Sequence, residues 1–227
     1  MELESRTNEI KQHLIELWSE LEEYPRARLL AVSKNFPASD IRIAHSLGQK
    51  SFAENRVQEL LAKQAELATL SDISWHLIGT LQANKVRKVV GKVELIHSVS
   101  SVALLERIER IAGEEAVKQD LLLQVKLAKD DNKQGLGAEE VLNLCKLHWD
   151  NVVIRGLMCI APNYDNKEEA KAVFMSATEL WHKMRSVLGE QCNILSMGMS
   201  GDYKYALECG ATHIRIGSQI FGKRIYK

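Results

Sequence analysis

The sequence predicts a (β/α)8 TIM barrel, a closed ring of eight parallel strands surrounded by helices, with one extra helix at the N-terminus. Short apolar runs of strand length alternate with longer stretches whose apolar residues recur every three or four positions. This alternation favours parallel strands with right-handed crossovers, and eight repeats favour a closed barrel over an open sheet. A Rossmann fold is disfavoured because no glycine-rich turn follows the first strand.

The expected strands are rich in β-branched and aliphatic residues and end in polar or small ones. They are Leu29–Ser33, Ser51–Glu54, Trp75–Gly79, Leu95–Val99, Leu121–Lys126, Val152–Met158, Ile194–Gly198 and His213–Gly217. Apolar residues from Ile10 to Leu21 share one face of an opening helix, which we expect to cap one end of the barrel. The most regular helical spacing runs from Ala170 to Val187.

Composition indicates a single globular domain. The chain has 227 residues, 45% of them hydrophobic, so we expect residues 1–227 to bury one sizeable core. Thirty basic residues balance thirty acidic ones, which leaves no global field to attract nucleic acid or an anionic membrane. The charged N-terminus lacks the apolar stretch of a signal peptide, and no apolar run approaches membrane-spanning length. We therefore expect a cytoplasmic protein with no nucleic-acid or membrane partner. We also expect a monomer.

The cysteines are scattered along the chain without paired spacing. They are Cys145, Cys159, Cys192 and Cys209. This spacing argues against both a disulfide framework and a zinc site. We expect reduced, mostly buried thiols and no bound metal.

Polar residues at the carboxyl ends of the strands are the site candidates, because a barrel of this kind carries its chemistry there. Lys34 directly follows the apolar run Leu29–Ser33. A lysine that points into the barrel mouth is partly desolvated, which lowers its pKa and frees the amine to attack an aldehyde. A solvated surface position is the other interpretation of Lys34, and this pattern alone leaves both open.

Two late segments end strands in small residues and are suited to surround an anion. Ser196–Ser200 precedes a helix start, which places the amides of Met199 and Ser200 at a positive helix end. Arg215–Ser218 ends the last strand, which neighbours the first in a closed barrel, so Lys34 is expected across from it. For Ser196–Ser200 the alternative is an ordinary serine-rich turn. For Arg215 the alternative is a salt bridge with an acidic residue elsewhere in the chain.

Six segments, in order along nearly the whole chain, resemble the pyridoxal phosphate homeostasis protein family. They are Ala31–Lys34, Phe52–Glu59, Trp75–Lys85, Arg155–Met158, Ser196–Ser200 and Arg215–Gly222. That family is similar to the barrel domain of alanine racemase and of eukaryotic-type ornithine decarboxylases, the fold type III enzymes. It differs from them by lacking the second, β-rich domain.

The resemblance implies that the cofactor is pyridoxal 5′-phosphate (PLP). It implies that Lys34 holds PLP as a Schiff base, that Ser200, Gly217 and Ser218 hold the phosphate, and that Arg215 approaches the pyridine nitrogen. Strand ends and resemblance together give the expected cofactor-binding residues, which are Lys34, Asn55, Met199, Ser200, Arg215, Gly217 and Ser218. No catalytic residue is assigned.

The sequence departs from the family pattern in three places. Ala53 replaces the usual glycine near Asn55, which leaves less room beside the cofactor. Ser218 stands where threonine is frequent, and both supply a hydroxyl. Asn132–Gly137 differs from the frequent Lys-Ser-Gly sequence of this loop, and a plain turn is the simpler interpretation.

We interpret His76 as a structural ring inside the barrel.

These features favour a cofactor carrier over an enzyme. Arg215 stays protonated, so it can donate to the pyridine nitrogen but cannot protonate it, and the ring remains a poor electron sink. Racemisation needs a base on each face of the substrate, and Lys34 supplies one. We expect a PLP-binding protein that buffers or delivers the cofactor, with apo-enzymes that need PLP as recipients and little or no catalysis.

Two other functions remain open. A PLP-dependent amino-acid racemase or decarboxylase of fold type III would use the same cofactor. An aldolase that forms a Schiff base without a cofactor would carry its lysine on a middle strand, and the sixth strand here offers Arg155 instead.

Overall fold

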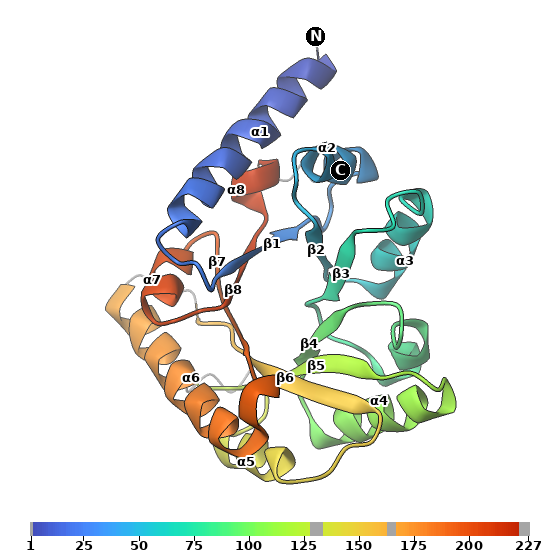
Figure 1. The fold of residues 1–227 in the computed structure, drawn as a ribbon, viewed down its shortest axis with the longest axis vertical. Helices are drawn as coiled ribbons and strands as arrows, with labels where there is room; N and C mark the ends of the chain where they lie inside the picture. Colours follow the sequence, from blue (N-terminus) through green and yellow to red (C-terminus); the bar gives the residue numbers. More distant parts are fainter. Residues whose placement is uncertain (1, 128–133, 163–166, 223–227) are drawn as a thin grey trace.

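The computed structural model describes residues 2–127, 134–162 and 167–222 (Figure 1). Within these residues, eight parallel strands close into a barrel in chain order, and helices lie in a ring outside the strands (Figure 1). The predicted TIM barrel with an extra N-terminal helix is confirmed.

The strands agree with the predicted ones, and no end differs by more than two residues. They are β1 (Arg28–Val32), β2 (Ser51–Glu54), β3 (Ser74–Leu77), β4 (Leu95–Val99), β5 (Gln119–Gln124), β6 (Val152–Met158), β7 (Ile194–Met199) and β8 (His213–Ile216). The α-helices are α1 (Glu2–Leu21), α2 (Ala38–Ser46), α3 (Val57–Glu66), α4 (Val102–Glu114), α5 (Ala138–Cys145), α6 (Lys167–Leu188), α7 (Tyr203–Glu208) and α8 (Ser218–Phe221). Two 3-10 helices are η1 (Ala83–Lys88), between β3 and β4, and η2 (Gly189–Gln191). Among the described helices, none combines the length and the apolar character that crossing a bilayer requires.

Helix α1 lies against the outside of the barrel, beside α2 and α8 (Figure 1). Its apolar face buries Ile10, Leu14 and Leu17 in the main core. Arg6 donates to the carbonyl oxygen of Phe221 in α8 at 2.8 Å. The expectation that this helix caps one end of the barrel is therefore wrong, because its apolar face packs into the outer ring of helices.

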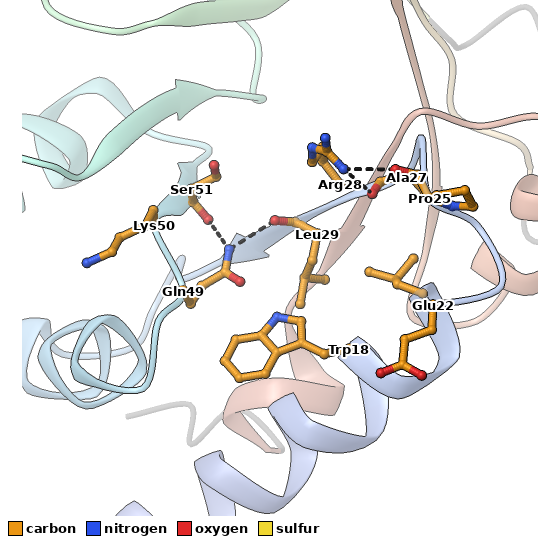
Figure 2. Close-up of a pocket in the computed structure, with 10 residues that line it drawn as sticks. Trp18, Glu22, Pro25, Ala27, Arg28, Leu29, Gln49, Lys50 and Ser51 are labelled. Carbon is orange, nitrogen blue, oxygen red and sulfur yellow. Dashed lines mark hydrogen bonds between the residues drawn. The ribbon is translucent and has the colours of Figure 1, made fainter.

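The last turn of α1 reaches the N-terminal end of the barrel, where a cavity of about 400 Å³ lies between α1 and the starts of β1 and β2 (Figure 2). Trp18 and Leu29 line this cavity. Gln49 Nε2 donates to the carbonyl oxygens of Leu29 at 2.9 Å and Ser51 at 2.8 Å, as Figure 2 shows, and so joins the first two strands. The cavity lies at the end opposite the carboxyl ends of the strands, away from the predicted site.

The inside of the barrel is partly polar, unlike the main apolar core between strands and helices. Two small apolar clusters lie inside, Leu30, Val32 and Ala53 with Ile78, and Leu95, Leu122 and Met158 with Ile194. The polar side chains His76, His97, Ser196 and Arg215 are also buried there, each at most 4% exposed. Barrel interiors are usually filled by branched apolar residues, so these polar groups need hydrogen bonds to offset the cost of burial. His76 lies inside the barrel, as expected from the sequence.

Desolvation keeps His76 inside the barrel and His213 at the start of β8 uncharged. It lowers the pKa of His76 to about 4. It also lowers the pKa of His213 to about 3, with further lowering from electrostatic interaction with His76 and Arg28. Histidine in an unfolded chain has an ordinary pKa of about 6.5. Between these values the unfolded chain binds protons that the folded barrel does not.

We predict that the free energy of unfolding falls as the pH is lowered from about 6.5 to about 4. Each histidine kept neutral in the fold then costs roughly 1.4 kcal/mol of stability per pH unit, because protonation favours the unfolded chain. Urea unfolding at a series of pH values measures this slope. His213→Asn should reduce it by the contribution of one histidine, and an unchanged slope would contradict a neutral, partly buried His213.

Candidate functional site

The parallel pairing of β1 with β8 brings the two ends of the sequence together at the barrel mouth. Leu30 pairs with Arg215, so the turn that holds Lys34 lies beside the loop that begins at Gly217. A Cβ atom placed on Gly217 would lie 3.0 Å from the carbonyl oxygen of Val32, so a side chain here would crowd the end of β1. The expectation that the first and last strands are neighbours is confirmed.

The end of β7 lies on the other side of β8. Met199 pairs with Arg215, which places the Ser200 turn at the same mouth. The Met199 amide donates to the carboxylate of Asp202 at 2.6 Å. Burial raises the pKa of Asp202, and the bond from Met199 and the charge of Arg215 oppose this shift. We expected the Met199 amide to face an anionic ligand, but it is already bonded to Asp202, which the sequence reasoning did not consider.

Lys34 is half-buried in the turn after β1, and both of its neighbours are held by carboxylates. Ser33 Oγ donates to Glu54 Oε1 at 2.7 Å. The amide of Asn35 donates to Glu59 Oε1 at 2.7 Å. Asn35 has a φ of 66°, a left-handed conformation that asparagine adopts more readily than most residues. The backbone on each side of Lys34 is therefore fixed by β2 and α3.

Lys63 of α3 is the centre of this buried network and is 6% exposed. Its Nζ donates to Glu54 Oε1 at 2.7 Å, to Glu59 Oε1 at 2.7 Å and to the carbonyl oxygen of Ser33 at 2.8 Å. These acceptors use all three ammonium hydrogens. Burial raises the pKa of Glu54, and Lys63 lowers it in part. Sequence reasoning missed this network, although Glu59 and Lys63 have the spacing of a helical ion pair.

We predict that Lys63→Met destabilises the protein by about 3–5 kcal/mol, because it leaves the Glu54 carboxylate buried without its cation. Chemical denaturation measures the loss. Lys85→Met is the control, because Lys85 Nζ lies at an exposed site, 3.3 Å from Gln58 Oε1. The control should change stability by less than about 0.5 kcal/mol. A loss in Lys63→Met as small as in the control would show that the network is not stabilising.

Asn55 follows β2 and has the properties of a ligand-binding residue. Its Oδ1 atom is buried and has no hydrogen-bond partner among the described residues. A buried acceptor without a partner costs about 1–3 kcal/mol, so a donor from a bound group would be favourable here. A Cβ atom on Gly79 would lie 2.1 Å from the carbonyl oxygen of Asn55, so only glycine fits beside it. The expected role of Asn55 fits this geometry.

Arg215 lies inside the barrel and is held by neutral acceptors. Its Nη1 donates to Ser196 Oγ at 2.9 Å and its Nη2 to the carbonyl oxygen of Cys159 at 3.0 Å. Burial lowers the pKa of Arg215, and Cys159 and Asp202 oppose the shift. No carboxylate of the described part of the chain forms a salt bridge with it. Of the two interpretations of Arg215, this geometry favours the one in which it faces a ligand.

The loop after β5 lies only partly within the described residues, because Asn132 and Lys133 fall outside them. Gln134 of this loop accepts a hydrogen bond from Thr80 Oγ1 at 3.2 Å. Both residues line a cavity of about 630 Å³ beyond the ends of β3 and β4. The loop therefore contacts the mouth on the side away from Lys34.

The four cysteines are unpaired, and all except Cys209 are buried, which confirms the expectation of mostly buried thiols. Burial raises the thiol pKa of Cys145 to about 11 and of Cys192 to about 12. Such thiols are poor nucleophiles near neutral pH. In the described part of the chain, no group of three or more His, Cys, Asp or Glu residues is arranged to hold a metal ion.

The sequence matches the family described as "Alanine racemase, N-terminal domain" over residues 7–224. A pyridoxal phosphate homeostasis protein of Aquifex aeolicus is 40% identical over 202 residues, which cover 88% of each chain. One from Synechocystis is 42% identical over 203 residues, covering 88% of this chain and 93% of the relative. The chain belongs to the pyridoxal phosphate homeostasis protein family.

Solved structures of other proteins contain the same barrel fold. PipY of Synechococcus elongatus PCC7942, solved with PLP bound, has a TM-score of 0.85 and 45% identity, covering 94% of this chain and 100% of PipY. The alanine racemase of Corynebacterium glutamicum has a TM-score of 0.68 and 14% identity, covering 98% of this chain and 60% of the racemase. The second likeness concerns the fold alone.

Proposed function

We propose that this protein binds PLP at Lys34 and takes part in intracellular PLP homeostasis by buffering or delivering the cofactor. One observation carries the proposal, the closure of β1 against β8, which places Lys34 beside the loop at Gly217 and near the end of the strand that holds Arg215. When bound, PLP supplies an aldehyde that reacts with an amine and a phosphate that needs donors. PipY, which is solved with PLP bound, supports the same choice.

Each residue has a distinct proposed role. Lys34 supplies the amine, and its neighbours are held by Glu54, Glu59 and Lys63. The loops after β7 and β8 supply Ser200, Gly217 and Ser218 as donors to the phosphate, each contributing on the order of 1.5–3 kcal/mol. Asn55 offers its buried amide oxygen, and Arg215 directs a positive charge at the pyridine ring. Met199 joins this set when its amide exchanges the carboxylate of Asp202 for the phosphate.

Binding without efficient turnover follows from the same residues. Arg215 keeps its proton and does not transfer it to the pyridine nitrogen, so the ring stabilises a substrate carbanion less well than a protonated pyridine would. Proton exchange at a substrate carbon also needs a base that is positioned on the correct face. The names of the relatives describe homeostasis, which agrees with a carrier. We place the protein in the cytoplasm as a monomer, with apo-enzymes that require PLP as recipients.

We predict that Lys34 carries the cofactor. Borohydride reduction after incubation with PLP, followed by digestion and mass spectrometry, should place the pyridoxyl mass on the peptide with Lys34. Lys34→Ala should lose the visible absorbance of the bound cofactor but remain folded, because a half-buried side chain at the mouth contributes little to the core. Lys126→Ala is the matched control, since Lys126 is also half-buried after a strand. Label found mainly on Lys85 or Lys126 would refute the assignment.

We predict that the loaded protein delivers PLP but does not catalyse. Mixed with an apo-enzyme that requires PLP, it should restore the activity of that enzyme while its own visible absorbance falls in step. With L-alanine in deuterated water it should exchange the α-hydrogen no faster than a slow background, because each ~1.4 kcal/mol of missing stabilisation costs tenfold in rate. Exchange near the ~10 per second typical of enzymes would make the protein a catalyst. Retention of PLP against every acceptor would exclude delivery.

A further inference from the structure

A continuous line of hydrogen bonds crosses the inside of the barrel, starting at Arg215. Its members, called here the interior chain, are Arg215, Ser196, His97, His76, Ser74 and Glu94. Arg215 Nη1 lies 2.9 Å from Ser196 Oγ, which lies 3.0 Å from His97 Nδ1. His97 Nε2 lies 2.9 Å from His76 Nδ1, and His76 Nε2 lies 2.9 Å from Ser74 Oγ. Ser74 Oγ bonds to the Glu94 carboxylate. Strands β4 and β7 are not neighbours, so the bond between His97 and Ser196 spans the barrel interior.

The Arg215 end of the interior chain sets the direction of its first bonds. An arginine side chain carries only donors. Ser196 Oγ therefore accepts from Arg215, and its own hydrogen is left for His97 Nδ1. An imidazole ring that accepts at Nδ1 and is neutral carries its hydrogen on Nε2. His97 is therefore expected as the Nε2–H tautomer.

The Glu94 end gives the same direction. Its carboxylate carries only acceptors at neutral pH, so the Ser74 hydroxyl donates to it. Ser74 Oγ then accepts from His76 Nε2, and His76 Nδ1 accepts from His97. If the direction were reversed, Ser74 would face Glu94 without a hydrogen between them, and the Ser196 hydrogen would lose its acceptor. The unmet Ser196 hydrogen is the costly one, because the Ser196 contacts are buried whereas the Ser74–Glu94 contact is exposed.

Both rings are neutral, as this direction requires. Burial lowers the pKa of His76 to about 4. Burial lowers the pKa of His97 well below its ordinary value, and electrostatic interaction with His76, His213 and Arg215 lowers it further. Each neutral ring offers one donor and one acceptor, which matches its two contacts in the interior chain.

We propose that the interior chain holds the Arg215 guanidinium in place, so that Ser196, His97 and His76 are positioning residues for the cofactor site. Its oriented bonds present their acceptor ends to Arg215, which stabilises a charge that has no carboxylate partner among the described residues. Arg215 Nη2 donates to the carbonyl oxygen of Cys159. These two bonds use two of the five N–H donors of the guanidinium, and the other three can bond to a ligand. The inference rests on the proposed function only for the identity of that ligand.

Nuclear magnetic resonance of the cofactor-free protein, labelled with ¹⁵N-histidine, tests the direction of the interior chain. Protonated and unprotonated ring nitrogens have well-separated shifts, so the tautomer of each ring is read directly. We expect the Nε2–H tautomer at both His76 and His97. An Nδ1–H tautomer at either ring would overturn the proposal. The measurement needs no PLP, so it stands whether or not Lys34 binds the cofactor.

Ser196→Ala tests the positioning role. We expect changed His97 nitrogen shifts and roughly tenfold weaker PLP binding, with the borohydride label still on Lys34. Ser196→Thr keeps the hydroxyl and should restore both readouts. Thr178→Val is the control, because Thr178 Oγ1 donates to the carbonyl oxygen of Cys209 at 2.6 Å on the outside of the barrel. It should change neither readout.

Wild-type His97 shifts and wild-type PLP affinity in Ser196→Ala would overturn the positioning role. If this variant does not fold, the wild-type tautomers still decide the direction on which the proposal depends. Failure of the wild-type protein to bind PLP would instead refute the proposed function.

Discussion

The hydrogen bonds between β1 and β8 join segments that lie nearly a whole chain apart, and the candidate site depends on them. Leu30 lies opposite Arg215 in this pairing. In an open sheet with the same strand order, Lys34 and Gly217 would lie at opposite edges. The entropic cost of joining distant segments grows only slowly with the number of residues between them. In a chain with a large apolar core, burial of that core can therefore offset the cost of closing the barrel. Closure also brings two buried charges, Lys63 and Arg215, to neighbouring parts of one mouth.

The two buried charges are compensated in different ways. Lys63 is bonded to two carboxylates, Glu54 and Glu59, so that group carries one net negative charge. Arg215 is bonded to a hydroxyl and a carbonyl, which leave its positive charge unbalanced. An anionic ligand is therefore favoured on the β8 side of the mouth, whereas the β2 side offers a rigid frame around an amine.

Much of the fold could be predicted from the sequence because strand and helix periods are local properties. Placing Lys34 and Arg215 at one mouth then required only the strand count and closure. Lys63 was missed because its spacing from Glu59 is equally typical of a solvated ion pair, and its burial depends on how α3 packs on β2. The partner of the Met199 amide was missed because a turn can bond its amides to its own side chains, here Asp202, as well as to a ligand.

The interior chain was beyond sequence reasoning for a different reason. Alternation in β4 predicts that His97 and Ile96 face opposite sides of the sheet, but it does not identify the lumen side or the group across it. That partner depends on the register of the strands in between, β5 and β6, and the β4–β5 and β5–β6 pairings each contain a register shift. A slip of one residue would turn His97 toward the helices and leave Ser196 without its acceptor. The polar interior therefore constrains the register of β4 and β7 in addition to apolar packing, because a slip would leave a buried hydrogen-bond donor without its acceptor.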